Sequence, residues 1–253
     1  MASVAYTVKE STKSKHVLLR VSYFDASLTV VIPKGFNRRL IPEVLQERQS
    51  WIERARKQVA ELRRQSGELP CALPERIRLR AIGREWQVSY EQAPGSVITL
   101  EENEDCLVLR GKVENTEACK LLLQRWLRIK AKLHLAPWLA EVSEKQGLPT
   151  GAVRVGAQRT RWASCSAQKT ISLNQKLLFL PPELVDYVFI HELCHTVHLN
   201  HSRKFWKLVQ ARAPEGAALE VEMRTAWRYV PAWLDRNGQG GEQRNHPTWP
   251  ARN

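Results

Sequence analysis

The sequence predicts an α+β fold, in which an antiparallel or mixed sheet packs on one apolar helix. Three observations lead to this prediction. Short strand-like runs occupy residues 4–34, 76–110 and 152–174, and longer helix-like runs occupy residues 40–65 and 115–145. A further apolar run follows Pro181, and it carries the densest group of histidines in the chain.

Residues 1–114 are expected to form a β-rich N-terminal region with one helix. Residues 4–34 alternate in β fashion, and two apolar runs flank Phe24-Asp25-Ala26, which predicts a hairpin. Leu45 and Val59 belong to a series at near-helical spacing, so a helix is expected at about residues 40–65. A linker is predicted at Gln65–Pro74. Strands are then predicted at residues 76–82, 85–91, 97–100 and 106–110.

Residues 115–238 are expected to form a second domain. A long helix is predicted over residues 115–145, before the helix-breaking Gly147-Leu148-Pro149. Strands follow near residues 152–157, 160–166 and 169–174, the last two joined as a hairpin. Residues 239–253 are rich in Gly, Gln, Asn and Pro and are expected to be a disordered tail.

The third helix carries His191-Glu192-Leu193-Cys194-His195. Pro182 suits its first turn and Asn200 suits its end. Residues four apart lie about 40° apart around a helix, so His191 and His195 can share a metal ion. Glu192 lies beside that face, where a carboxylate can take a proton from a metal-bound water. This is the H-E-x-x-H arrangement of zinc hydrolases.

A catalytic zinc ion needs three protein ligands and one open position. His201, on the turn after Asn200, is the favoured third ligand. His198 is the alternative, either as a ligand or as a residue at the rim of the site. Glu215 has the spacing of the third ligand in some zinc peptidases, but Ala213-Pro214-Glu215-Gly216 predicts a turn instead.

Composition limits the compartment and the partners. The chain has 253 residues and no 18-residue apolar run, and its N-terminus lacks the pattern of a signal peptide, so no membrane contact is expected. Five scattered cysteines without a C-x-x-C pair favour the cytoplasm. Among them, Cys165 is expected to be structural, with a reactive thiol near the site as the alternative.

The net charge of +13 suggests a polyanionic partner such as nucleic acid. The densest basic run, on the predicted helix 115–145, is the candidate contact, and a solvated helix face is the alternative. The run comprises Arg125, Arg128, Lys130 and Lys132.

Several linked motifs in residues 153–210 resemble the YgjP-like metallopeptidases, relatives of the SprT-like zinc proteins. The motifs are Arg161–Ser166, Ile171–Asn174, Leu180–Pro182, Asp186–Val188, His191–His195, Asn200–Ser202 and Phe205-Trp206. The resemblance implies a zincin-like fold with one zinc ion on His191, His195 and His201, and Glu192 as the base.

The sequence therefore predicts a zinc-dependent metallopeptidase. A zinc phosphohydrolase acting on nucleotides is one alternative, and a basic nucleic-acid-binding protein with a structural zinc is another. Residues 171–174 (Ile171, Ser172, Leu173 and Asn174) are predicted to form the edge strand that pairs with a peptide substrate. The group that stabilises the oxyanion is left open among Arg161, Asn174 and Tyr229.

Overall fold

The computed structural model describes residues 5–12, 14–22, 26–66, 72–158 and 161–234. Among them, the chain divides into two compact units, which meet in sequence between residues 72 and 73. No helix in these ranges is both long enough and apolar enough to span a membrane. Phe24, Asp25, residues 67–71 of the predicted linker and the predicted tail lie outside the described residues.

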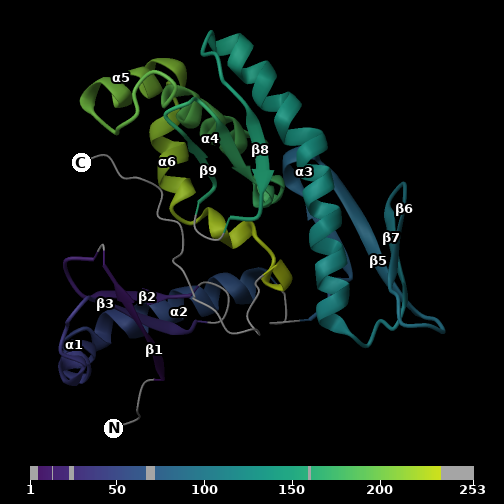
Figure 1. Ribbon diagram of the computed structural model, residues 1–253, viewed down its shortest axis with the longest axis horizontal. Helices are drawn as coiled ribbons and strands as arrows, with labels where there is room; N and C mark the ends of the chain where they lie inside the picture. Colours follow the sequence, from purple (N-terminus) through teal and green to yellow (C-terminus); the bar gives the residue numbers. More distant parts are fainter. Residues whose placement is uncertain (1–4, 13, 23–25, 67–71, 159–160, 235–253) are drawn as a thin grey trace. The chain divides into compact units, whose positions relative to one another are not determined.

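The first unit is a small three-stranded sheet with two helices (Figure 1). The order β1-β3-β2 combines the predicted antiparallel hairpin of β2 and β3 with β1 added parallel to β3. Leu28, Val30 and Ile32 on β3 pack with apolar residues of both helices to form the core. The elements are β1 (Tyr6–Ser11), β2 (Leu18–Val21), β3 (Leu28–Pro33), η1 (Arg38–Leu40), α1 (Ile41–Glu47) and α2 (Gln49–Ser66).

The single helix predicted at about residues 40–65 is thus two helices. The backbone leaves helical geometry at Arg48, the C-cap of α1, where φ is −104° and ψ is 11°. Ile41, Leu45 and Ile52 still contact one core, which explains why their spacing reads as one continuous helix.

The second unit begins with a four-stranded sheet in the order β4-β5-β7-β6. β5 and β7 are parallel, and the two outer strands pair antiparallel with them. The predicted strand 76–82 ends at Leu79, because the chain turns through η2 (Arg80–Ile82) to Gly83 at φ 62°. The strands are β4 (Arg76–Leu79), β5 (Arg84–Gln92), β6 (Thr99–Asn103) and β7 (Cys106–Gly111).

Helix α3 (Thr116–Gln146) connects this sheet to the rest of the second unit (Figure 1). Trp126 in its first half packs edge-on against Trp86 of β5, with ring centroids 5.1 Å apart. Trp138 in its second half packs against Phe189, 5.6 Å away. These shared contacts place residues 73–114 in the same unit as α3, so the division falls at residue 72 and not at the expected residue 114.

The remaining elements surround a small mixed sheet in the order β8-β10-β9. β10 is parallel to β8 and antiparallel to β9, and β9 contacts α4. An α+β fold with a mixed sheet on the histidine-bearing helix is therefore confirmed. The elements are β8 (Val153–Gly156), β9 (Ala163–Cys165), β10 (Ile171–Asn174), η3 (Gln175–Phe179), α4 (Pro182–Cys194), α5 (Arg203–Arg212), α6 (Gly216–Met223), η4 (Ala226–Tyr229) and η5 (Ala232–Leu234).

The prediction that residues 171–174 form an edge strand is wrong. β10 is the middle strand, and its main chain pairs with β8 on one side and β9 on the other. Ile171 and Leu173 are fully buried. Among the described residues, the two edge strands of this sheet are β8 and β9, and β9 is the one that contacts α4.

Helix α4 begins at Pro182, as predicted, but it ends at Cys194 and not near Asn200. The next residues form turns, in which the Thr196 hydroxyl donates to the carbonyl of Leu193, 2.7 Å away. His195 caps the helix with αR backbone angles, so the four-residue spacing from His191 keeps its helical geometry.

Candidate metal centre

Helix α4 places the histidine pair and the carboxylate inside the protein. Residues 187–194 are all buried, so the last two turns of α4 are surrounded by the rest of the protein. His191 is 2% exposed, Glu192 5% and His195 8%. Such burial is costly for polar side chains unless partners or a bound ion compensate them.

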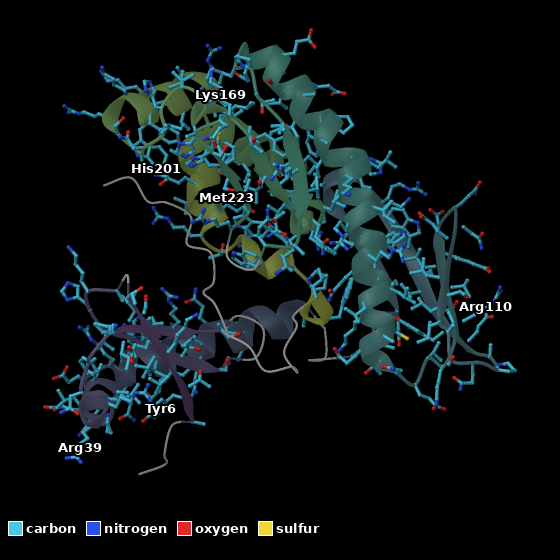
Figure 2. The ribbon with its side chains drawn as sticks, viewed as in Figure 1. Tyr6, Arg39, Arg110, Lys169, His201 and Met223 are labelled. Atoms are coloured by element: carbon cyan, nitrogen blue, oxygen red, sulfur yellow. The ribbon has the colours of Figure 1, made fainter. Side chains whose placement is uncertain are left out.

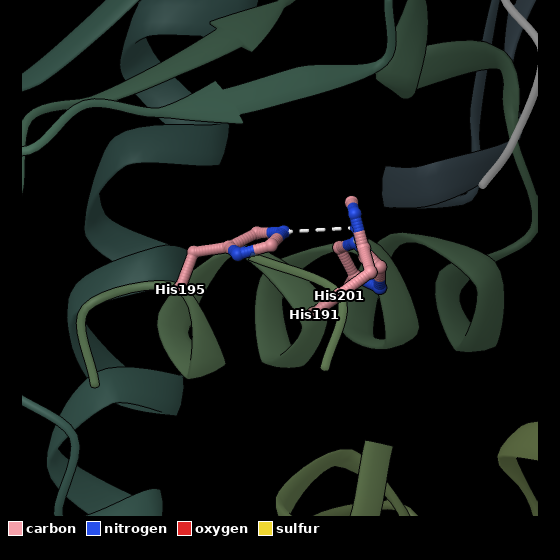
Figure 3. Close-up of side chains that lie close together, drawn as sticks. All are labelled: His191, His195 and His201. Carbon is pink, nitrogen blue, oxygen red and sulfur yellow. Dashed lines mark hydrogen bonds between the residues drawn. The ribbon is translucent and has the colours of Figure 1, made fainter. Parts of the chain in front are cut away.

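His201 completes a group of three imidazoles (Figure 3). The loop after α4 carries it back over the helix, and Ser202 then starts α5 by accepting a hydrogen bond from the N–H of Phe205. The Nε2 atom of His201 lies 3.2 Å from Nε2 of His195 and 3.2 Å from Nε2 of His191. All three candidate ligand atoms lie within 4.8 Å of one another.

This geometry fits a tetrahedral metal ion. Two imidazole nitrogens that are each 2.0–2.1 Å from one tetrahedral zinc ion lie about 3.3–3.4 Å apart, close to the observed separation. Burial, together with the charges of His195 and His201, lowers the pKa of His191 well below its usual value. Burial is also the main cause that lowers the pKa values of His195 and His201. The three rings are therefore neutral near pH 7, the form that binds a metal.

Two features orient these rings. Nδ1 of His195 lies 2.9 Å from the carbonyl oxygen of His198, so Nδ1 carries the proton and Nε2 is left as the acceptor. The buried ring of Phe205 stacks on His195 at 4.3 Å and meets His191 and His201 edge-on at 5.0 and 4.9 Å. Phe205, one of the residues that carry the family resemblance, is thus a common neighbour of all three histidines.

Glu192 lies next to β9. The backbone N–H of Cys165 faces its carboxylate and favours its charged form, as the charge of Arg161 does. Burial nevertheless dominates and raises the pKa of Glu192 to about 8, because Arg161 and the Cys165 N–H offset only part of the desolvation. This main-chain group had no signal in the sequence, since every residue except proline supplies an N–H.

Other predicted site residues lie outside the imidazole group. His198 is half-buried and contributes its backbone carbonyl, and Glu215 is exposed at the start of α6. Burial, with the charge of Glu192 next, raises the pKa of the Cys165 thiol to about 11, which argues against a reactive thiolate. Tyr229 donates to Glu222 at 2.7 Å and accepts from Arg228, so its hydroxyl is already engaged.

Asn174 is also engaged. Its amide nitrogen donates to the carbonyls of Gln158 and Arg161, both at 2.7 Å, and its amide oxygen accepts from the N–H of Lys176. A side chain with these three bonds has no donor left for an oxyanion. Asn174 instead ties down the carbonyls of Gln158 and Arg161, which precede β9.

The predicted basic face on α3 is incomplete. Lys130 forms a 2.6 Å ion pair with Glu102 and lies over the ring of Trp86. Arg125, Arg128 and Lys132 remain exposed. This arrangement gives no reason to prefer a nucleic-acid-binding site to an ordinary solvent-exposed helix face.

A protein-family model described as "YgjP-like, metallopeptidase domain" matches residues 15–226. No curated protein matches the chain. Among solved structures, the metallopeptidase zymogen abylysin of Pyrococcus abyssi is 27% identical over 36% of this chain and 92% of its own, with a TM-score of 0.33. The metallopeptidase zymogen jannalysin of Methanocaldococcus jannaschii is 22% identical over 35% of this chain and 92% of its own, with a TM-score of 0.32.

Proposed function

Because the chain belongs to the YgjP-like metallopeptidase family, we propose that it is a zinc-dependent peptidase. The proposed ligands of one zinc ion are His191, His195 and His201, and the proposed general base is Glu192. The observation that carries the proposal is the convergence of three imidazoles beside a buried carboxylate. Three imidazoles suit zinc, and they leave the open position that catalysis needs.

The chemistry divides between the ion and the protein. A bound zinc ion supplies a Lewis acid that polarises the scissile carbonyl and lowers the pKa of water. Glu192 accepts the proton of the attacking water and passes it to the leaving amine. The Cys165 N–H faces the carboxylate, and the apolar surroundings make it a stronger base than a solvated glutamate.

The free side of β9 is the proposed binding edge for the substrate main chain, in place of β10. Ser166 N–H donates to the Thr170 carbonyl, and Asn174 N–H donates to the Trp162 carbonyl. In an antiparallel pair these bonds alternate, so Ala163 and Cys165 direct their main-chain groups away from β10. The Cys165 N–H, which points away from β10, faces Glu192 in agreement with this alternation. An extended peptide on this edge passes directly over the proposed base.

The cysteines support a reducing compartment, and we propose the cytoplasm. Cys106, Cys119, Cys165 and Cys194 are free thiols. Disulfides rarely persist in the cytoplasm, whereas free thiols are ordinary there.

Glu192→Gln tests the proposed function. The amide keeps the size of the side chain but cannot accept the proton, so turnover of a casein-derived peptide mixture is expected to fall about 100-fold or more. Zinc content should stay at one per chain, as measured by elemental analysis. The control Glu215→Gln changes an exposed glutamate at the start of α6 and should leave both values unchanged. A zinc-loaded Glu192→Gln protein with wild-type turnover would show that another group is the base.

A further inference from the structure

Two positively charged side chains flank the free edge of β9. Arg161 lies two residues before the strand, and Lys169, labelled in Figure 2, lies in the turn that follows it. We propose that Arg161 and Lys169 select extended peptides that carry carboxylates on either side of the scissile bond. This inference rests on the proposed function and names its substrate class.

Hydrogen bonds to Asn174 hold the backbone carbonyls of Arg161 and Trp162. The Arg161 carbonyl accepts a 2.7 Å hydrogen bond from the buried Asn174 amide. The next residue, Trp162, accepts from the Asn174 N–H at 2.9 Å and stacks on Trp227 with ring centroids 4.2 Å apart. The Arg161 side chain itself is exposed, so a fixed backbone presents a free guanidinium next to Glu192.

The backbone around Lys169 is held in a similar way. Lys169 has φ 60°, and its N–H donates to the Ser166 carbonyl at 2.9 Å. Its own carbonyl accepts from the N–H of Gly151 at 2.9 Å. The side chain is exposed, and its charge is felt at Cys165, the residue whose N–H faces Glu192.

Neither cation has an internal counter-ion. Among the residues that the structure describes, no carboxylate lies within ion-pair distance of either side chain, whereas Arg110 in the same unit pairs with Glu91 and Glu101. The segment 161–170 contains no acidic residue at all. Apart from Glu192, which is buried beside β9, a substrate carboxylate would therefore meet two exposed cations and no acidic residue of the segment itself.

The spacing places the two charges on opposite sides of the reacting bond. The Cys165 N–H faces Glu192, so the scissile bond is expected near the C-terminal end of β9. Arg161 precedes β9 and Lys169 lies in the turn that follows it, so the two charges lie at opposite ends of the strand. A guanidinium binds a carboxylate through two parallel N–H groups, and an ammonium binds one as a point charge. Because both cations are solvent-exposed, each carboxylate is expected to strengthen binding only about 1.5-fold to fivefold.

Peptide binding to zinc-loaded Glu192→Gln protein tests the inference without turnover. The probes are fluorescein-labelled octapeptides of Ala, Ser and Leu, in which one Glu is moved along the sequence, with a matched Gln series. Each peptide is made with a free and with an amidated C-terminus, which separates a side-chain carboxylate from the terminal one. We expect peptides with Glu at one or two positions, or with a free C-terminus, to bind about 1.5-fold to fivefold more tightly, and this preference to shrink as salt rises.

Variants then assign the preference. Arg161→Met and Lys169→Met should each abolish the preference for Glu over Gln at one peptide position, whereas Arg161→Lys should keep part of that preference. Arg154→Met is the control, because it removes an exposed cation on β8, the opposite edge of the same sheet. Equal binding of the two series, or a preference that survives both methionine variants, would overturn the inference alone. If the wild-type protein neither binds nor cleaves any of these peptides, the proposed function falls and the inference falls with it.

Discussion

Asn174→Ala offers the most quantitative test of how the cleft is built. The side chain is fully buried and makes three hydrogen bonds, with the carbonyls of Gln158 and Arg161 and with the N–H of Lys176. Each hydrogen bond contributes about 1 kcal/mol, and a buried group left without a partner costs about 1–3 kcal/mol. The free energy of unfolding should therefore fall by about 3–5 kcal/mol, and the Tm of a unit of this size by roughly 6–20 °C.

Urea denaturation followed by tryptophan fluorescence measures this change. Ser172→Ala, on the same strand, is the control and should change the free energy of unfolding by less than about 0.5 kcal/mol. Asn174→Asp adds a pH test. The introduced carboxylate would face two carbonyl oxygens, so its pKa rises on folding, and the variant should gain stability as pH falls and lose it as pH rises. A cost below about 1 kcal/mol for Asn174→Ala would refute the view that this residue ties down the carbonyls that precede β9.

Two further predictions concern the neighbours of the metal centre. Phe205→Leu should weaken zinc binding about 10-fold, measured in competition with a chelator, because the ring that orients the three histidines is lost. The control Phe179→Leu removes an equally buried ring on η3 and should leave the zinc affinity unchanged. An equal loss of zinc affinity in both variants would show that Phe205 does not orient the histidines. Because the pKa of the Cys165 thiol is raised to about 11, only about 0.1% of it is thiolate at pH 8. Iodoacetamide should therefore label the exposed Cys106 well before Cys165 in the native protein, and the reverse order by mass spectrometry would contradict the burial of that thiol.

The parts of the site that follow from local geometry were predictable from the sequence. The i,i+4 relation of His191 and His195 is a property of any helix, and Pro182 marks where that helix begins. The return of His201 to the helix was predicted from its position after Asn200, and the structure brings its Nε2 to 3.2 Å from the other two.

The parts that depend on distant pairing were not predictable. An apolar run such as Ile171–Asn174 reads the same at an edge and in the middle of a sheet, and only the parallel addition of β8 makes β10 central. The same limit applies to the candidates for the group that stabilises the oxyanion. Asn174, Tyr229 and Arg161 are equally polar in sequence, but folding engages the first two in internal hydrogen bonds and leaves the Arg161 side chain exposed.

The domain boundary illustrates a third limit. Helix α3 follows the first four strands of the second unit, so the sequence suggests a division before it. The contact of Trp126 with Trp86 joins α3 to the strands on its N-terminal side, and Trp138 joins it to α4 through Phe189. Large aromatic side chains thus make one unit of segments that their order in the chain separates.

X-ray absorption spectroscopy of the zinc-loaded protein tests the central claim most directly. The three converging imidazoles predict three nitrogen ligands with the multiple-scattering signature of histidine, at about 2.0–2.1 Å, and one further oxygen ligand from solvent. His201→Ala should reduce the histidine count from three to two. A sulfur ligand at about 2.3 Å, as Cys165 would give, or a fourth imidazole, as His198 would give, would show a closed structural site and contradict the peptidase mechanism.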